Sequence, residues 1–297
     1  MNYVLEINNL SKNYGSVQAL NNVSYKVPAG TVFGILGPNG SGKTTMLGII
    51  MDILRATSGG IQLFGETPTA EHRRRMGTLL ETPNFYHYMS AVDNLKIAAA
   101  IKGVDNPDIE GVLKKVNLFE RKDSKFQTFS LGMKQRLAIA SCLLGNPEVL
   151  VFDEPTNGLD PVGIAEIRTL IKAVAQEGKT IIMASHLLDE VEKVCTHVAI
   201  MKKGTLLASG SVDEILANDD MAETGAANTA QLMQVLSSMP GQTKVEAGLN
   251  GKVNVHFPIG TANLAQLNQH CFNHGIVLDH LQMKKKSLEA KFLEMTN

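Results

Sequence analysis

The stretch Gly37-Pro38-Asn39-Gly40-Ser41-Gly42-Lys43-Thr44-Thr45 decides how the rest of the chain is interpreted. It fits G-x-x-x-x-G-K-[ST], the pattern of a phosphate-binding P-loop. The mostly apolar run 31–36 before it predicts a buried strand, and the run 44–54 after it predicts a helix. In such a loop the glycines turn backbone N–H groups toward phosphate, and the helix N-terminus adds partial positive charge. We therefore expect these nine residues to bind a nucleoside triphosphate. Lys43 would neutralise the β- and γ-phosphates, and the Thr44 hydroxyl would help to hold Mg²⁺.

A second apolar run, Val149–Phe152, ends in two carboxylates, Asp153 and Glu154. At the end of a buried strand Asp153 is placed to hold Mg²⁺, directly or through water. Glu154, one residue on, points elsewhere and could polarise the attacking water as the catalytic base. The alternative is a strand that merely ends in acidic residues at the surface.

Composition limits the possible classes of protein. The 297 residues leave room for one large domain and a smaller one, and 44% hydrophobic residues favour a sizeable core. A net charge of −1 gives no general attraction to nucleic acid, so we expect no nucleic-acid partner.

The 3 cysteines are far apart in the sequence, which favours buried, reduced thiols in a cytosolic protein over disulfides or a zinc site. The N-terminus lacks the pattern of a signal peptide, and no apolar run approaches a membrane span. Any membrane role would therefore be played through a partner.

Strands alternate with helices along most of the chain, which predicts an α/β core with a mostly parallel sheet. The block from about 85 to 145 has helical patterns only and predicts a helical insertion. We expect the main domain to span 1–216. A shift toward Ala, Asn, Asp and Thr predicts a linker over 217–241, and a small α+β appendage is expected over 242–297.

Two further stretches are candidate parts of the nucleotide site because of where they lie in the sequence. Phe129-Ser130-Leu131-Gly132-Met133-Lys134-Gln135-Arg136 begins a predicted helix about twenty residues before the Val149 strand. A helix start of this kind is an anion site, although alone it is equally a capped helix. Ser185-His186 follows the predicted strand 180–184, where a lone histidine could equally be a packed residue.

The order of these motifs, with Asn157-Gly158-Leu159-Asp160 between Glu154 and His186, resembles the ATP-binding cassette of ABC transporters over roughly residues 1–215. The resemblance implies a P-loop NTPase cassette with an antiparallel β subdomain. It implies that two cassettes pair head to tail as a homodimer. Ser130 and Gly132 of one would then contact the γ-phosphate held by the other, with Asp160 at the seam. His186 would contact the γ-phosphate and orient Glu154, and Tyr14 would stack on adenine, unless Tyr14 only packs on the core.

Two positions depart from the usual cassette pattern. Leu131 and Met133 replace a small and a polar residue, and Glu81 stands where a glutamine is expected. We expect Glu81 to contact Mg²⁺, directly or through one water. The alternative is an outward-turned side chain that caps the loop or binds a permease arginine. Both departures, and the C-terminal stretch 287–293, resemble the bacitracin-resistance and lantibiotic-immunity group of ABC exporters.

The resemblance implies an ATP-hydrolysing subunit that powers export through separate integral-membrane permease subunits, using ATP and Mg²⁺. Such a subunit would be cytoplasmic and peripheral on the inner face of the plasma membrane. The aromatic segment Pro83–Met89 and the helix after it are expected to dock the permease, or else to cap the local core. A soluble ABC ATPase acting on ribosomes or DNA is the alternative. The single P-loop and the absence of sustained heptads in the sequence argue against it.

Overall fold

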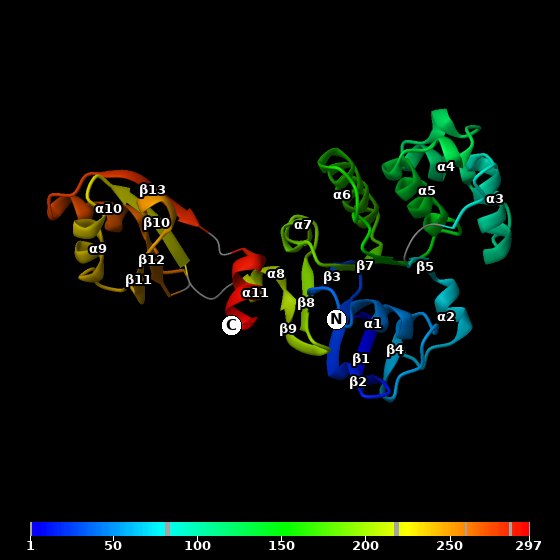
Figure 1. The fold of residues 1–297 in the computed structure, drawn as a ribbon, viewed down its shortest axis with the longest axis horizontal. Helices are drawn as coiled ribbons and strands as arrows, with labels where there is room; N and C mark the ends of the chain where they lie inside the picture. The colour runs from blue at the N-terminus through cyan, green and yellow to red at the C-terminus, as the bar shows by residue number, and fades with distance from the viewer. Residues whose placement is uncertain (1, 81–83, 217–219, 259, 285–286, 297) are drawn as a thin grey trace. The chain divides into compact units, whose positions relative to one another are not determined.

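The structure, a computed structural model, describes residues 2–80, 84–216, 220–258, 260–284 and 287–296. It divides into two compact units, Met1–Ser211 and Val212–Asn297 (Figure 1). Each unit is described by itself below.

A six-stranded sheet forms the centre of the first unit. Its order is β5 (Met76–Leu79), β6 (Val149–Asp153), β7 (Thr180–Ser185), β3 (Val32–Leu36), β8 (His197–Lys202) and β9 (Thr205–Ser211). All neighbouring strands are parallel except β8 and β9, as the alternation of strands and helices predicts. The register pairs Leu36 with Ser185 and Asp153 with Ala184. The carboxyl ends of β3, β6 and β7 therefore lie at one edge of the sheet, and their following loops meet there.

A second, antiparallel sheet packs with helix α1 (Lys43–Ile50) against this core. It consists of β2 (Val17–Pro28), β1 (Tyr3–Tyr14) and β4 (Ser58–Leu63), in that order. Met46 and Leu47 of α1 are fully buried in a cluster with residues of both sheets, such as Leu5 and Ile35. The helix ends at Ile50 rather than at the expected Leu54. The N–H groups of residues 53 and 54 instead donate to the Gly48 carbonyl, which satisfies an orphan group at the helix C-terminus.

The expected helical insertion is present as α3 (Ala91–Lys102), α4 (Ile109–Lys115) and α5 (Leu131–Leu143), with short 3₁₀ turns at Phe119–Arg121 and Phe126–Thr128. These helices gather in a lobe of their own beyond β5 (Figure 1). Ser90, Asp108 and Ser130 cap the three helices, each accepting a hydrogen bond from a backbone N–H three residues on. The first unit also contains α2 (Ala70–Arg74), α6 (Pro161–Gln176) and α7 (Leu188–Glu192).

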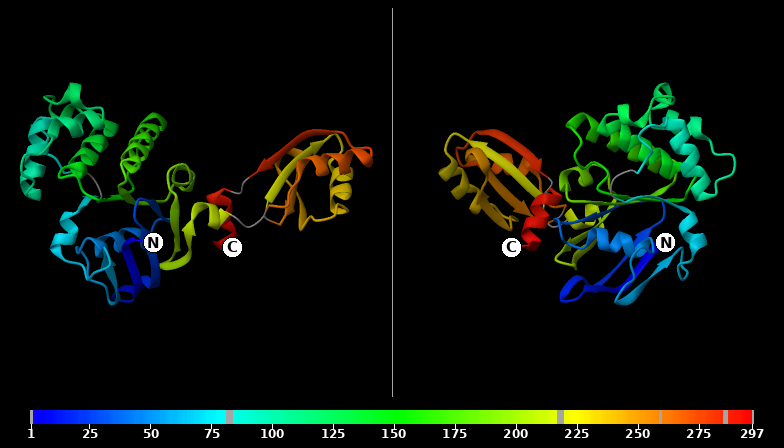
Figure 2. Two further views of the ribbon diagram at one scale, coloured as in Figure 1. Left: turned by 180° about the vertical axis from the view of Figure 1, so that it is seen from behind. Right: turned by 45° about the vertical axis from the view of Figure 1, so that its right-hand side comes forward.

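The second unit contains a four-stranded antiparallel sheet with two helices. In chain order the elements are β10 (Asp220–Ala226), α9 (Thr229–Ser237), β11 (Lys244–Ala247), a 3₁₀ turn at Leu249–Gly251, β12 (Val253–Phe257), α10 (Leu264–Asn273) and β13 (Leu278–Lys284). The strand order β11-β12-β10-β13 with this β-α-β-β-α-β connectivity is the ferredoxin-like arrangement. Figure 2 shows both helices on one face of the sheet, where Leu232, Leu236 and Leu267 are fully buried. Two helices, α8 (Val212–Leu216) and α11 (Leu288–Thr296), flank this fold in the sequence.

The linker expected over 217–241 differs from what the structure has there. Residues 220–226 form β10, which lies between β12 and β13, and residues 229–237 form α9. The small and polar residues of β10 are buried because strands pair with it on both sides, an effect of tertiary contacts that composition does not reveal.

Glu223 of β10 holds a cluster of basic side chains on the sheet. Its carboxylate lies 3.0 Å from the Lys252 ammonium and 2.9 Å from Nε2 of His280, and it also pairs with Lys284. The hydrogen bonds from Lys284 and then Lys252 outweigh burial and lower the pKa of Glu223 to about 2. Because the folded-state pKa is depressed, this stabilisation is present above the ordinary carboxyl range and is lost as the pH falls toward 2.

We therefore expect Glu223→Gln to lower stability at pH 7 by about 1 kcal/mol. The difference in melting temperature from the wild type should shrink between pH 5 and pH 2, as the wild-type carboxylate becomes protonated. Thermal unfolding of both proteins, followed by circular dichroism from pH 7 to pH 2, measures this difference in melting temperature. Equal melting temperatures at pH 7 would show that the cluster contributes nothing.

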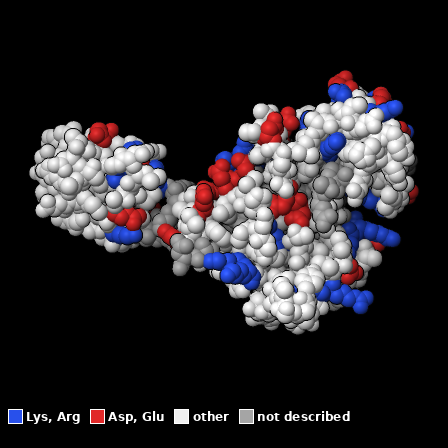
Figure 3. All heavy atoms as spheres, viewed as in Figure 1, with Lys and Arg blue, Asp and Glu red and all other residues white. Residues whose placement is uncertain are grey.

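All 3 cysteines are buried, as the sequence predicts, and none is joined to another in a disulfide. Among the described residues, no helix combines the length and apolar composition that crossing a bilayer requires. On the face seen in Figure 3, acidic and basic side chains are interspersed over the first unit.

Candidate nucleotide site

The P-loop joins β3 to α1 and takes a backbone course that requires glycine. Gly42 caps α1 with a φ of 101°, and a Cβ on it would lie 2.5 Å from the Ala19 carbonyl oxygen. Gly37 has a φ of 156°, and a Cβ there would lie 2.4 Å from the Met201 carbonyl oxygen. Side chains at either position would therefore displace neighbouring backbone. The loop ends at the N-terminus of α1, whose free N–H groups suit an anion.

Lys43 lies folded back over the P-loop. Its buried ammonium group donates to the carbonyl oxygens of Gly37, at 2.8 Å, and Pro38, at 3.3 Å. It also lies 3.4 Å from Oε1 of Glu154. The Lys43 ammonium is thus held among oxygen atoms, which a bound phosphate could replace.

Thr44 and Asp153 meet at the same floor. The Thr44 hydroxyl donates to Oδ2 of Asp153 over 2.8 Å, although the two residues are 109 positions apart. Hydroxyl and carboxylate oxygens are ligands that Mg²⁺ accepts, and Mg²⁺ in nucleotide sites usually takes one or two carboxylates plus phosphate oxygens and water. Thr44 and Asp153 supply two such oxygens, so the pair fits an ion that it would share with phosphate.

Glu154 has a strained backbone and a defined partner on each oxygen. Its φ is 47°, in the left-handed region that non-glycine residues rarely occupy, while its N–H donates to the Ala184 carbonyl oxygen over 3.0 Å. Oε2 lies 2.8 Å from Nδ1 of His186 and accepts from the His186 backbone N–H at 3.3 Å. This turn aims the carboxylate away from Asp153 and toward His186 and Lys43.

One pocket collects much of the predicted site. It is lined by three groups: P-loop residues Asn39, Gly40, Gly42, Lys43, Thr44 and Thr45; the carboxylate residue Glu154; and Val17, Gln18, Ala19 and Lys203 from β2 and the turn after β8. The last group was not expected from the sequence, because it reaches the P-loop only through the tertiary fold. Ser41 lies beneath, with its buried hydroxyl lacking a hydrogen-bond partner in the described part of the chain.

Other predicted residues lie outside this pocket. Tyr14, at the end of β1, is 46% exposed, and the Lys12 ammonium lies 5.0 Å from its ring centre. Ser130 and Asp160 cap α5 and α6, and Gly132 is in the first turn of α5. Glu81 lies outside the described residues.

The sheet order, the P-loop and the acidic end of β6 define a P-loop ATPase of the ATP-binding cassette class. The chain belongs to the ABC transporter family, whose sequence model matches residues 20–157. It is therefore the ATP-binding and ATP-hydrolysing subunit of an ABC transporter.

Similar proteins extend this result over the whole chain. The sequence is 35% identical to the uncharacterized ABC transporter ATP-binding protein YhcH of Bacillus subtilis, over 100% of this chain and 97% of that protein. It is 32% identical to the bacitracin transport ATP-binding protein BcrA of Enterococcus faecalis, over 99% of this chain and 97% of that protein. It is 40% identical to the lantibiotic transport ATP-binding protein SrtF of Streptococcus pyogenes, over 71% of this chain and 92% of that protein. Among solved structures, cbiO1 of Clostridium perfringens, part of the cbiONQ transporter complex, matches with a TM-score of 0.67 and 29% identity, over 81% of this chain and 97% of that one.

Proposed function

We propose that this chain powers the export of a peptide antibiotic through separate membrane permease subunits. The likeness to bacitracin and lantibiotic transport proteins supports the cargo class, because it extends with BcrA through the second unit. The observation that carries the ATPase part is the position of Glu154 between Lys43 and His186. Attached to the permease, the subunit would sit at the inner face of the membrane.

Hydrolysis would use the side chains that meet at the sheet edge. The γ-phosphate would replace the carbonyl oxygens around Lys43, and Glu154 would accept a proton from the attacking water. His186, hydrogen-bonded to Glu154, would keep that carboxylate in position. Thr44 and Asp153 would hold Mg²⁺, which supplies charge neutralisation to the phosphates, and we propose Glu81 as a further contact of the metal.

We propose that the working unit is a homodimer. Ser130 and Gly132 lie at the N-terminus of α5, outside the nucleotide pocket of their own chain. In a head-to-tail dimer they would contact the γ-phosphate bound by the partner cassette, with Asp160 at the seam. ATP would favour the closed dimer only if it binds that state more tightly than the open one. Tyr14 would stack on the adenine.

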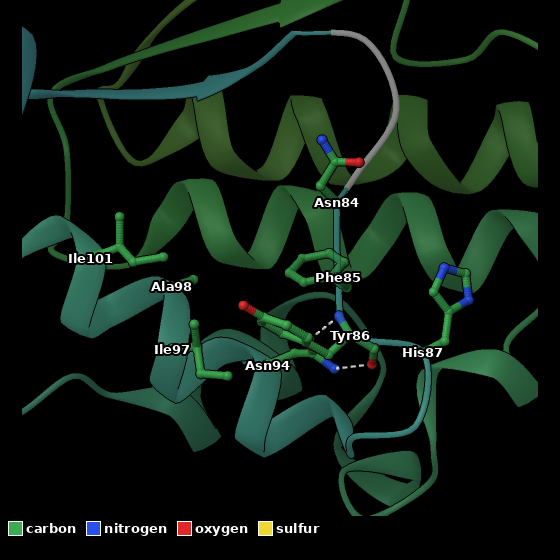
Figure 4. Close-up of a pocket in the computed structure, with 8 residues that line it drawn as sticks. All are labelled: Asn84, Phe85, Tyr86, His87, Asn94, Ile97, Ala98 and Ile101. Carbon is green, nitrogen blue, oxygen red and sulfur yellow. Dashed lines mark hydrogen bonds between the residues drawn. The ribbon is translucent and has the colours of Figure 1, made fainter.

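A groove beside α3 is our candidate for the permease-docking surface (Figure 4). It is lined by Asn84, Phe85, Tyr86, His87, Asn94, Ile97, Ala98 and Ile101. The buried Asn94 side chain accepts a hydrogen bond from the Tyr86 N–H at 2.7 Å and donates one to the Tyr86 carbonyl oxygen at 3.1 Å. These two bonds hold the backbone at Tyr86 against α3. Tyr86 is nevertheless 50% exposed and Ile101 81% exposed. A rigid, apolar, open groove suits a short apolar helix of the permease.

We expect alanine substitution of both Phe85 and Tyr86 to weaken permease binding about tenfold, because aromatic anchors dominate such interfaces. Co-purification of the subunit with the permease from detergent-solubilised membranes measures this. Ile53→Ala is the matched control, since Ile53 is 66% exposed and lies outside the groove. If the double variant bound the permease as tightly as the wild type, the docking site would lie outside this groove.

The transport function is tested in cells that lack the chromosomal copy of this subunit. Wild-type protein should restore growth in bacitracin or in a lantibiotic, whereas Glu154→Gln protein made at the same level should not. Equal protection by both proteins would disprove an ATP-driven role in resistance.

A further inference from the structure

Lys203 is a second cation at the nucleotide pocket, and its role is not explained by the P-loop motif. It lies in the turn between β8 and β9, and it lines the pocket together with Val17, Gln18 and Ala19. Lys43 is at the floor of this pocket, where it is already engaged with Gly37, Pro38 and Glu154.

The turn that carries Lys203 is fixed to the P-loop. The Gly204 N–H donates to the Ser41 carbonyl oxygen over 3.0 Å, and the Gly204 carbonyl oxygen accepts from the Asn21 N–H over 2.8 Å. A Cβ on Gly204 would lie 2.7 Å from the Ala19 carbonyl oxygen, so the turn packs directly on β2. These contacts hold Lys203 at a φ of 48°, a strained conformation that persists only where the surroundings impose it. The backbone of Lys203 therefore keeps a constant position beside the P-loop.

The ammonium group of Lys203 is available to a ligand. Lys203 is exposed, and within the described part of the chain it has neither an ion pair nor a hydrogen-bonded partner for this group. Among the described residues that line this pocket, Lys43 is the other cation and Glu154 is the carboxylate. A second cation therefore favours the binding of the strongly negative triphosphate. In the proposed binding mode the β- and γ-phosphates lie on the P-loop and the adenine stacks on Tyr14, which pairs with Val17 of β2. The α-phosphate would then lie between these two places, near the part of the pocket that Val17 and Lys203 line.

We propose that Lys203 binds the α-phosphate of the nucleotide. This inference rests on the proposed assignment of the P-loop pocket to the triphosphate. A contact with the α-phosphate strengthens the binding of ATP and ADP alike, because both carry that group. Since Lys203 is exposed, its contribution also falls as salt screens the charges.

The test measures dissociation constants for ATP and ADP by calorimetry on the full chain. We expect Lys203→Ala to weaken both nucleotides by roughly three- to fivefold at low salt, with a smaller loss at high salt and with most of the affinity restored in Lys203→Arg. Lys172→Ala removes the same charge from an exposed position on α6 outside the pocket, and it should bind both nucleotides as the wild type does.

Three results would overturn the inference. One is wild-type affinity in Lys203→Ala, and another is a loss confined to ATP, which would place the contact at the γ-phosphate. The third is a loss seen with ATP but not with 2′-deoxy-ATP, which would place it at the ribose. Lys43→Ala separates this inference from the function on which it rests. If Lys43→Ala also binds ATP normally, the pocket assignment itself fails; if only Lys203→Ala binds normally, the inference alone fails.

Discussion

Purified Glu154→Gln protein should hydrolyse ATP at least about 100-fold more slowly than the wild type, because the loss of a general base typically costs this much. It should nevertheless bind ATP. Glutamine keeps the size of the side chain and can still accept a hydrogen bond from the His186 N–H, now made to Oε2 at 3.3 Å. It also removes the negative charge that lies 3.4 Å from the Lys43 ammonium, so that the phosphates no longer compete with a carboxylate for this cation.

The expected consequence is a stable ATP-bound dimer. Size-exclusion chromatography with and without ATP should show an ATP-dependent dimer for Glu154→Gln. The rate of ATP hydrolysis is measured separately, as phosphate release. Glu120→Gln is the matched control, because Glu120 is an exposed glutamate in a 3₁₀ turn outside the nucleotide pocket. Turnover near the wild-type rate in Glu154→Gln would exclude Glu154 as the base.

The parts of the site that the sequence predicts are those set by local pattern. The P-loop glycines, the strand before them and the helix after them occupy adjacent positions, so their spacing alone indicates a phosphate site. The apolar strand β6 likewise ends at Asp153 as its sequence suggests. Parallel strands then bring the loops after β3, β6 and β7 to one edge, which is why Thr44 and Asp153 are within hydrogen-bond distance.

The parts that the sequence does not predict depend on contacts between distant segments. Lys203 reaches the pocket because the β8–β9 turn binds Ser41 and Asn21 through Gly204. The Lys-Lys-Gly turn was visible in the sequence, but nothing in it indicates which loop it meets. Strand β10 has a glutamate and a glycine among its buried residues, and only its pairing with β12 and β13 makes it a strand.

The left-handed backbone of Glu154 is a third feature of this kind. A glutamate has no local preference for that conformation, so the conformation depends on its hydrogen bond to Ala184 of the neighbouring strand.

Gly132→Asp should abolish ATP hydrolysis while leaving the fold of the chain intact. Gly132 lies in the first turn of α5, and outside its chain neighbours and its own helix backbone a Cβ there would meet no atom of the described residues within 4 Å. A carboxylate there is favourable to the helix, because it interacts with the positive N-terminal end. In the proposed dimer the same carboxylate would face the γ-phosphate of the partner cassette and repel it. We expect the rate to fall at least about 100-fold, since like charges in a closed site repel by several kcal/mol. ATP binding to the monomer should persist.

Mixing two inactive variants tests whether each site is shared between two chains. Lys43→Ala lacks the P-loop cation but keeps an intact α5 N-terminus, and Gly132→Asp has the opposite defect. A mixed dimer therefore contains one complete site, built from the P-loop of one variant and the α5 N-terminus of the other. An equal mixture should regain up to about a quarter of the wild-type rate, because half of the dimers are mixed and each has one working site of two. Melting temperatures of both variants serve as the control for folding. No recovery from the mixture, with both variants folded, would contradict the head-to-tail arrangement.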